Sequence, residues 1–207
     1  MCGRYYVEKA DLEAAIRLIA GDAQPRNLPP DGSVVCRSGE VFPSQVAAVI
    51  ANSRRLVPCA FAMQWGFRQQ GQPRPLINAR AETAAVKPTF AESAKARRCL
   101  IPLSHYYEWE ARNGGRVRHA IRPAGAQRAF LAGLYRPRPG NLPEFVVLTR
   151  PAADAIRFIH DRMPVLIPEA GARAWLDPAN PLGALLPGAL DRVEWREDPA
   201  QDGAAEK

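Results

Sequence analysis

The sequence has no apolar run long enough to cross a bilayer, which takes about 20 residues in a helix. It shows no secretory signal, because Arg4 is followed by tyrosine, valine, glutamate and lysine rather than by an apolar stretch. It has no C-x-x-C pair, and none of its three histidines lies at metal-ligand spacing from a cysteine. We therefore expect a cytosolic protein with reduced cysteines, no bound metal and no cofactor.

Acidic residues are too few to balance the basic ones. The chain has 28 Lys and Arg against 21 Asp and Glu, a net charge of +7, and arginine outnumbers lysine. This excess favours a polyanionic partner, and the planar guanidinium suits phosphate. A basic protein without such a partner is the alternative. With 207 residues, 47% of them hydrophobic, the chain is long enough for one domain with a substantial core.

Many short strands and few helices, not in strict alternation, predict an α+β fold. We expect a single domain over residues 1–195, built on a largely antiparallel, curved, barrel-like sheet with flanking helices, and a frayed polar tail over 196–207. Helices are predicted over 11–20, 88–98, 152–159 and 169–176. Strands are predicted over 45–50, 56–65, 99–102, 104–111, 116–121, 129–135, 145–149, 165–167 and 193–195, with polar loops over 22–33 and 69–75.

Cys2 is the most informative single residue. If Met1 is removed, which the small side chain at position two favours, Cys2 carries a thiol and a free α-amine on adjacent carbons. An ammonium group nearby lowers a thiol pKa, and an α-amine with a pKa of about 7.7–8.0 is partly neutral at neutral pH. This aminothiol can capture an aldehyde as a Schiff base and close a thiazolidine ring. A cysteine that stands at position two without function is the alternative.

Two polar segments are candidates for the rest of a site. In residues 76–83, Asn78, Arg80 and Glu82 would share one face of an extended segment and form a polar site rather than part of a core. In residues 106–110, Glu108 is flanked by aromatic residues, which favours a desolvated carboxyl with a raised pKa that suits acid–base work. Solvated strand faces are the alternative for both.

The segment around His160 is a third candidate. His160 follows an apolar run and precedes Asp161 and Arg162, so it could transfer protons, although a structural histidine is the commoner outcome. Arg162 could hold a phosphate or form a surface ion pair. Cys59 and Cys99 have apolar neighbours and are predicted to be buried structural thiols.

Together these segments closely resemble the SRAP (SOS-response-associated peptidase) proteins, which include sensors of abasic sites in single-stranded DNA. The matching pieces occur in family order: Met-Cys-Gly-Arg-Tyr at the start, Met-Gln-Trp-Gly-Phe at 63–67, Ile-Asn-Ala-Arg-Ala-Glu-Thr at 77–83, Arg-Cys-Leu-Ile-Pro at 98–102, Tyr-Tyr-Glu-Trp at 106–109, Leu-Thr at 148–149 and His-Asp-Arg-Met-Pro at 160–164. Each piece is weak alone, whereas the ordered set over residues 2–176 is specific.

The resemblance implies a function and a role for each residue. The N-terminal cysteine of the family crosslinks to the aldehyde of an abasic deoxyribose, so Cys2 is the expected nucleophile. Asn78 would orient it, Glu108 would act as acid and base, and His160 would assist proton transfer. The remaining residues belong to the expected DNA-binding part of the site. Arg4, Arg80 and Arg162 are the expected phosphate contacts. Thr149 would support the pocket, and Trp65 would lie against the DNA.

The expected partner is single-stranded DNA with an abasic site, bound by a monomer with little sequence preference. Two departures from the family pattern concern how the chain would hold the DNA strands that flank the lesion. Residues 39–45 lack the commoner Asn-x-Ala-Pro form, and Arg68 follows Phe67 where many members have a Pro-Trp cluster.

Two other hypotheses are a cysteine peptidase, as the family name suggests, and a non-catalytic single-strand binder. Because only Met1 precedes Cys2, we expect no leader for self-cleavage; lyase activity is a further expectation.

Overall fold

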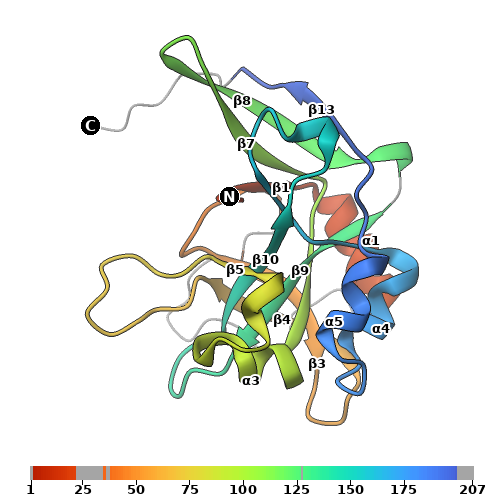
Figure 1. Cartoon of the computed structure of the whole chain (residues 1–207). Coiled ribbons are helices and arrows are strands. Elements are labelled where there is room, and N and C mark those ends of the chain that lie inside the picture. Colours follow the sequence, from red (N-terminus) through yellow and green to blue (C-terminus); the bar gives the residue numbers. More distant parts are fainter. Residues whose placement is uncertain (1, 22–34, 36–37, 127, 200–207) are drawn as a thin grey trace.

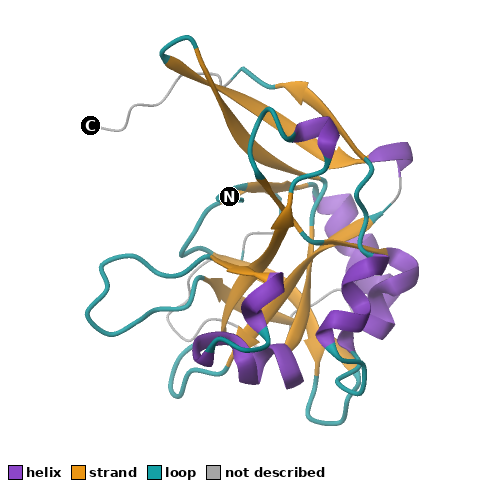
Figure 2. Cartoon of the chain, in the orientation of Figure 1, coloured by secondary structure: helices purple, strands orange, loops and turns teal. Residues whose placement is uncertain are grey.

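The computed structural model describes residues 2–21, 35, 38–126 and 128–199. Its helices lie outside a strand-rich centre (Figures 1 and 2). They are α1 (Lys9–Ala20), α2 (Ala81–Ala84), α3 (Pro88–Ala96), α4 (Ala172–Leu176) and α5 (Leu182–Leu185). The strands are β1 (Tyr5–Val7), β2 (Gly39–Val41), β3 (Val46–Asn52), β4 (Pro58–Trp65), β5 (Asn78–Arg80), β6 (Arg98–Pro102), β7 (His105–Arg112), β8 (Gly115–Pro123), β9 (Ala129–Arg136), β10 (Glu144–Pro151), β11 (Arg162–Pro164), β12 (Leu166–Pro168) and β13 (Val193–Glu197).

Five strands close into a ring. Strand β10 pairs with β4 on one side and with β9 on the other, and β4, β3, β6 and β9 pair in that order. All pairings in the ring are antiparallel except β4–β10, which is parallel. Strands β3 and β6 are buried over almost their whole length, as their apolar residues require. The prediction of an α+β fold with a curved, barrel-like, largely antiparallel sheet is confirmed.

A second sheet packs against this barrel in the order β13-β8-β7-β1-β2. In Figure 1 its long β7–β8 hairpin extends above the barrel. Tyr5 of β1 contacts Trp65 of β4 with ring centroids 5.5 Å apart, which joins the two sheets through the core. Because β1 lies between β2 and β7, the residues just before Tyr5 are held where the two sheets meet.

Gly133 is required where β9 passes between β6 and β10. A Cβ atom there would lie 2.5 Å from Ile101 Cδ1 and 2.7 Å from Cys99 Sγ, both on fully buried side chains. We expect Gly133→Ala to lower the free energy of unfolding by about 1–3 kcal/mol, because the packed core must shift. Urea unfolding measures the change. Gly183→Ala is the control, because its Cβ meets nothing within 4 Å; an equal loss there would contradict the packing explanation.

Most predicted elements lie where expected, with three corrections. Residues 152–159 form only one 3-10 turn, at Asp154–Ile156, because β10 and β11 are antiparallel neighbours and the chain must reverse between them. Glu82 does not share a strand face with Asn78, since the chain enters α2 at Ala81. Strand β13 continues to Glu197, two residues into the predicted tail.

Other expectations have mixed outcomes. Cys59 and Cys99 are buried, as predicted. Met1, the 22–33 loop and residues 200–207 of the predicted tail lie outside the described residues, as does Cys36. Within the described ranges, no helix is both long and apolar enough to span a membrane, and no group of three or more His, Cys, Asp and Glu side chains is arranged to hold a metal ion.

Candidate functional site

Three pairs of strands bring the predicted residues together. Strand β1 pairs with β7, so that Tyr5 lies opposite Tyr106 and the Tyr107 N–H donates to the Arg4 carbonyl at 3.0 Å. Strand β5 pairs with β10, placing Arg80 opposite Thr149, and β10 pairs with β11, which follows His160. In Figure 1 the N-terminal segment lies beside β1, above β5 and β10. Residues distant in sequence thus meet at one end of the barrel.

Cys2 is fully buried and is held through its backbone. The Asn78 side-chain amide donates to the Cys2 carbonyl oxygen at 2.8 Å, and Cys2 Sγ lies 3.9 Å from the Arg4 carbonyl. The other atom of the Asn78 amide, Oδ1, is buried and has no hydrogen-bond partner among the described residues. Asn78 therefore holds the Cys2 backbone and has a buried acceptor without a partner among the described residues; its orienting role stays a prediction.

Glu108 lies on the same buried face of β7 as Tyr106, whereas Trp109 points to the other face. Burial raises the pKa of Glu108, and nearby positive charges oppose this effect, among them Arg116 and, when its ring is protonated, His160. Burial and then the neighbouring Cys2 and Glu108 raise the pKa of Tyr106. Cys2, Tyr106 and Glu108 thus form one buried cluster of titratable groups, and Tyr106 is a member that sequence reasoning missed.

The thiol of Cys2 differs from the expectation. Burial raises its pKa well above the ordinary range, and the charge of Glu108 raises it further. A resting thiolate is therefore not the ground state of this chain. A thiolate would form here only if a base removed the thiol proton, and Glu108 is the carboxylate whose charge reaches Cys2.

His160 is positioned by the backbone that follows it. Its Nδ1 accepts a hydrogen bond from the Arg162 N–H at 2.9 Å, which places the proton of the neutral ring on Nε2. The same Nδ1 lies 2.7 Å from Asp161 Oδ1, but one nitrogen cannot accept and donate at once. We assign the acceptor role, because Asp161 is 83% exposed and well solvated. When the His160 ring is protonated, its charge lowers the pKa of Glu108.

The Arg162 side chain is held in place by hydrogen bonds to Glu82 and Thr149. Its guanidinium donates to both Glu82 oxygens, at 2.6 and 2.9 Å, and to the Thr149 carbonyl at 2.7 Å. The Arg162 hydrogen bond is the main reason that the pKa of Glu82 is lowered. Sequence reasoning named Glu82 but not this partner. The phosphate contact predicted for Arg162 stays a prediction, because its guanidinium is engaged by Glu82 and Thr149 in this structure.

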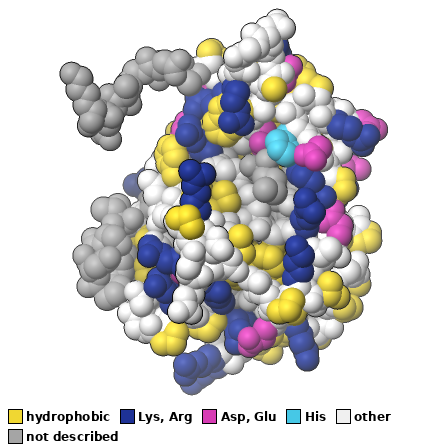
Figure 3. All heavy atoms as spheres, turned by 60° about the vertical axis from the view of Figure 1, so that its left-hand side comes forward, with side chains coloured by type: hydrophobic (Ala, Val, Ile, Leu, Met, Phe, Trp, Pro, Cys, Tyr) yellow, Lys and Arg dark blue, Asp and Glu magenta, His cyan; other side chains and the backbone are white. Residues whose placement is uncertain are grey.

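The other two predicted arginines differ in their surroundings. Arg80 is exposed at the end of β5, directly before α2. Arg4 pairs with Glu40 at 3.2 Å and stacks between aromatic rings, 4.4 Å from the centroid of Phe42 and 5.1 Å from that of Trp109. Figure 3 shows Lys and Arg side chains spread over the face that is turned forward, with a histidine visible among them. Their phosphate contacts stay predictions.

Two residues of the predicted DNA-binding set, Trp65 and Thr149, are buried. Trp65 is fully enclosed, its indole N–H donates to the Ile77 carbonyl at 3.0 Å, and its ring stacks on Phe145. The expected contact of Trp65 with DNA is therefore wrong; a ring in the barrel core has no face for a base. Thr149, expected to support the pocket, is also fully buried, and its carbonyl oxygen accepts a hydrogen bond from the Arg162 guanidinium.

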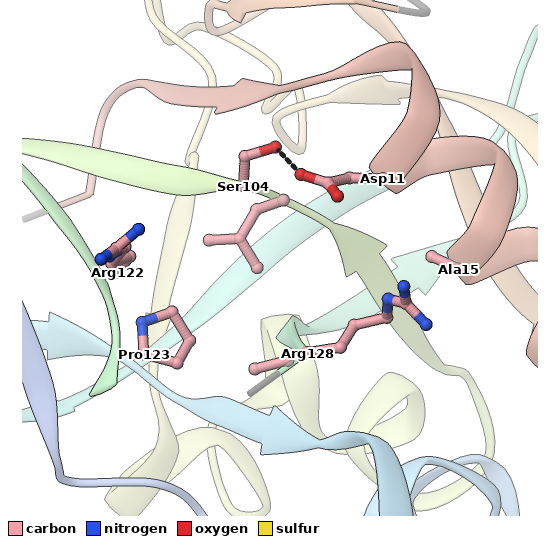
Figure 4. A pocket seen from close by; sticks show the side chains of 8 residues that line it. Asp11, Ala15, Ser104, Arg122, Pro123 and Arg128 are labelled. Carbon is pink, nitrogen blue, oxygen red and sulfur yellow. Dashed lines mark hydrogen bonds between the residues drawn. The ribbon is translucent and has the colours of Figure 1, made fainter. Parts of the chain in front are cut away.

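A separate polar cavity is lined by none of the predicted site residues. It lies beside α1, where Ser104 Oγ donates to Asp11 and accepts from the Glu8 N–H at 2.9 Å. Figure 4 shows Arg122 and Arg128 around this hydrogen bond. These two arginines pair with Glu194 and Glu169. The polar groups here connect α1 to neighbouring segments, and we assign the cavity no catalytic role.

The raised pKa of Glu108 makes stability depend on pH. The folded chain keeps the Glu108 proton at pH values where the unfolded chain has lost it, so wild-type stability falls as pH rises from the ordinary glutamate range through the folded pKa. Each unit of pKa elevation corresponds to about 1.4 kcal/mol. We expect the melting temperature of Glu108→Gln, relative to that of the wild type, to increase as pH rises over that interval. A difference that does not change with pH would show that Glu108 is not desolvated.

The fold is that of a single α+β domain, and its candidate site is centred on a buried cysteine near the N-terminus. The chain belongs to the SOS response associated peptidase (SRAP) family, whose family model matches residues 1–196.

Relatives with curated names are similar over part or most of the chain. The abasic site processing protein YobE of Bacillus subtilis is 33% identical over 128 residues, which are 59% of this chain and 55% of that protein. YedK of Escherichia coli, an abasic site processing protein, is 26% identical over 85% of this chain and 79% of its own length. The chain spans about half the length of the first of these relatives.

Solved structures show the same fold. A phage-related protein from Bordetella bronchiseptica superposes with a TM-score of 0.73 at 24% identity and covers 96% of this chain and 94% of its own. A Bacteroides thetaiotaomicron protein superposes with a TM-score of 0.76 at 17% identity, over 95% and 91% of the two chains. At these identities the likeness concerns the fold alone.

Proposed function

We propose that this protein processes abasic sites in single-stranded DNA by forming a covalent crosslink through Cys2. The carrying observation is the placement of a buried Cys2 thiol beside Asn78 and Glu108 at one end of the barrel. The names of its relatives YobE and YedK, abasic site processing proteins, support the same substrate. In this proposal Met1 is first removed, because the amide nitrogen of an acylated Cys2 cannot form a Schiff base.

The proposed chemistry has two steps and releases one water. The neutral α-amine of Cys2 adds to the ring-opened aldehyde C1′ of the deoxyribose, and loss of water from the carbinolamine gives a C=N bond. The thiol sulfur then adds to that carbon while its proton passes to the imine nitrogen. The result is a thiazolidine ring with one C–N and one C–S bond, formed without oxidant, metal or cofactor.

Each site residue has a part in these steps. Asn78 holds the Cys2 carbonyl and offers its buried Oδ1 to the amine or the sugar. Glu108, with its raised pKa, can be protonated to release water from the carbinolamine and ionised to receive the thiol proton. His160, with its ring fixed by the Arg162 N–H, supplies a second proton carrier close to Glu108.

The arginines would hold the DNA backbone. Arg80 is exposed at the site and has no ion pair in the described structure, so it is the first candidate for a phosphate contact, with Arg4 beside Cys2 as a second. The Arg162 guanidinium already binds the Glu82 carboxylate, so it would have to bind a phosphate and Glu82 at the same time. Contacts to phosphate carry no sequence information, so we expect little sequence preference. We expect a monomer that works in the cytoplasm, where bacterial DNA is exposed.

A denaturing gel tests the proposal. Protein whose free N-terminal Cys2 has been verified by mass spectrometry is incubated with an oligonucleotide that carries one abasic site. We expect a shifted band that survives denaturation, and none with undamaged DNA. Salt-sensitive binding without such a band would instead indicate a non-catalytic binder, and cleavage of an added peptide would indicate a peptidase. The protonated resting thiol does not favour the peptidase, which needs an activated thiolate.

A further inference from the structure

Two large aromatic side chains are exposed side by side outside the predicted site. Phe158 is 50% exposed and Trp195 is 43% exposed, and their ring centroids lie 5.0 Å apart. Both pack edge-to-face on His119, whose ring is fully buried and whose Nε2 lies 3.0 Å from Glu110 Oε2. The histidine thus forms a fixed base under the pair, and each exposed ring has surface left for another planar group.

The pair lies on the same sheet face as the candidate acid–base residue. Trp195 of β13 lies opposite Ile121 of β8, which lies opposite Tyr106 of β7. Residues directly opposite each other in a sheet share a face, and Glu108, two residues beyond Tyr106, shares it too. This face is buried at Tyr106 and Glu108 and becomes exposed at Trp195, two strands away. Neighbouring strands are about 4.8 Å apart, so the distance across is roughly 10 Å.

The second ring is tied to the site through the chain. Phe158 precedes His160 by two residues, and the connection that carries both is closed by the Ala152 N–H, which donates to the Asp161 carbonyl at 2.9 Å. Ile156 and Ile159 of the same connection are buried. The aromatic pair is therefore fixed relative to His160 as well as to Glu108.

We propose that Phe158 and Trp195 form a stacking platform for an unpaired base next to the lesion, so that the protein contacts DNA bases as well as the DNA backbone. This inference rests on the proposed function and names a further contact for the same substrate. The platform shares its sheet face with Glu108, the exposed Arg80 supplies a cation at the candidate site, and the chain has a net charge of +7. Single-strand binders combine these two features, aromatic faces for bases and cations for phosphates.

The platform would supply an exposed ring, which the buried Trp65 does not offer. A base that flanks the lesion needs an exposed ring, and the tryptophan predicted from the family pattern offers none. Phe158 and Trp195 provide such rings at another edge of the site. Stacking requires only a π-face, so the platform would accept any base and would agree with low sequence preference.

The test measures binding without crosslinking. A fluorescent single strand carries one tetrahydrofuran residue, an abasic analogue without an aldehyde. We expect Trp195→Ala and Phe158→Ala to weaken its binding about 5- to 150-fold, the loss of one stacked base. Trp195→Phe should largely restore affinity. The dependence on salt should keep its slope in all of these variants, because no phosphate contact is removed.

Leu18→Ala is the matched control, because Leu18 is 41% exposed on α1 and lies on no part of the platform. In a second readout, 2-aminopurine replaces each base near the lesion in turn; its fluorescence should be quenched at one position by the wild type and not by Trp195→Ala. Unchanged affinity in both alanine variants, or equal quenching with and without Trp195, would overturn the platform.

The two proposals fail separately. If the wild type crosslinks the aldehyde but both alanine variants bind the tetrahydrofuran strand normally, only the platform is wrong. If the wild type never crosslinks while the alanine variants bind poorly, the covalent function is wrong and the platform stands.

Discussion

Replacing Cys2 with alanine is expected to abolish the adduct that survives denaturation. The α-amine of such a variant can still form a Schiff base, but no thiol on the adjacent carbon can close the ring, and water reverses the imine. Intact-mass measurement of the reaction mixture should show only free protein for Cys2→Ala. For the wild type it should show protein plus oligonucleotide less one water.

Two controls separate this loss from misfolding. Cys59→Ala removes another buried thiol, in β4 of the barrel, and should leave the adduct yield unchanged in a protein that still folds. Borohydride added to Cys2→Ala should trap the Schiff base as a stable amine, which shows that the aldehyde still reaches the amine. A stable adduct formed by Cys2→Ala without borohydride would contradict the thiazolidine.

Replacing Glu108 with glutamine is expected to slow crosslinking about 10²- to 10⁴-fold, the usual contribution of a positioned acid–base group. Glutamine keeps the size of the side chain but can neither deliver a proton to the departing water nor receive one from the buried thiol. The measurement is single-turnover crosslinking at saturating DNA, so that weaker binding does not enter. Reversal of the isolated adduct should slow as well, because the reverse path uses the same proton transfers.

Glu110→Gln is the matched control for Glu108→Gln. Glu110 shares the strand face with Glu108, but its carboxylate is engaged by Arg112 and His119, which lower its pKa. We expect its crosslinking rate to stay close to that of the wild type. Equal losses in the two variants would show a general disturbance of β7, and an unchanged rate for Glu108→Gln would exclude its assigned role.

Local sequence patterns predicted the elements that depend on local chemistry. Alternation and turn residues placed the β7–β8 hairpin, Pro88 marked the start of α3, and Gly21 the end of α1 in a left-handed conformation. The aromatic neighbours of Glu108 correctly predicted a desolvated carboxyl. The helix expected over 152–159 failed because the antiparallel pairing of β10 with β11 overrides the helical pattern there.

The parts of the site that depend on tertiary contacts could not be predicted from sequence. The Arg162–Glu82 pair joins residues 80 positions apart, and only the β5–β10–β11 pairing brings them together. The buried state of Cys2, which reverses the expected direction of its thiol pKa, follows from the packing of β1 between β2 and β7. Phe158 and Trp195 carry no motif, and their proximity appears only when β13 lies beside β8.

The most direct test of the central claim places one alanine between Met1 and Cys2. After removal of Met1, that alanine carries the α-amine, and Cys2 keeps its thiol but has an amide nitrogen. If the crosslink is a thiazolidine made by the Cys2 aminothiol, this variant should give no adduct that survives denaturation with an abasic-site oligonucleotide, while wild type with a free Cys2 amine gives it readily. A stable adduct from the variant at the wild-type yield would contradict the mechanism, because it would form without the amine of Cys2.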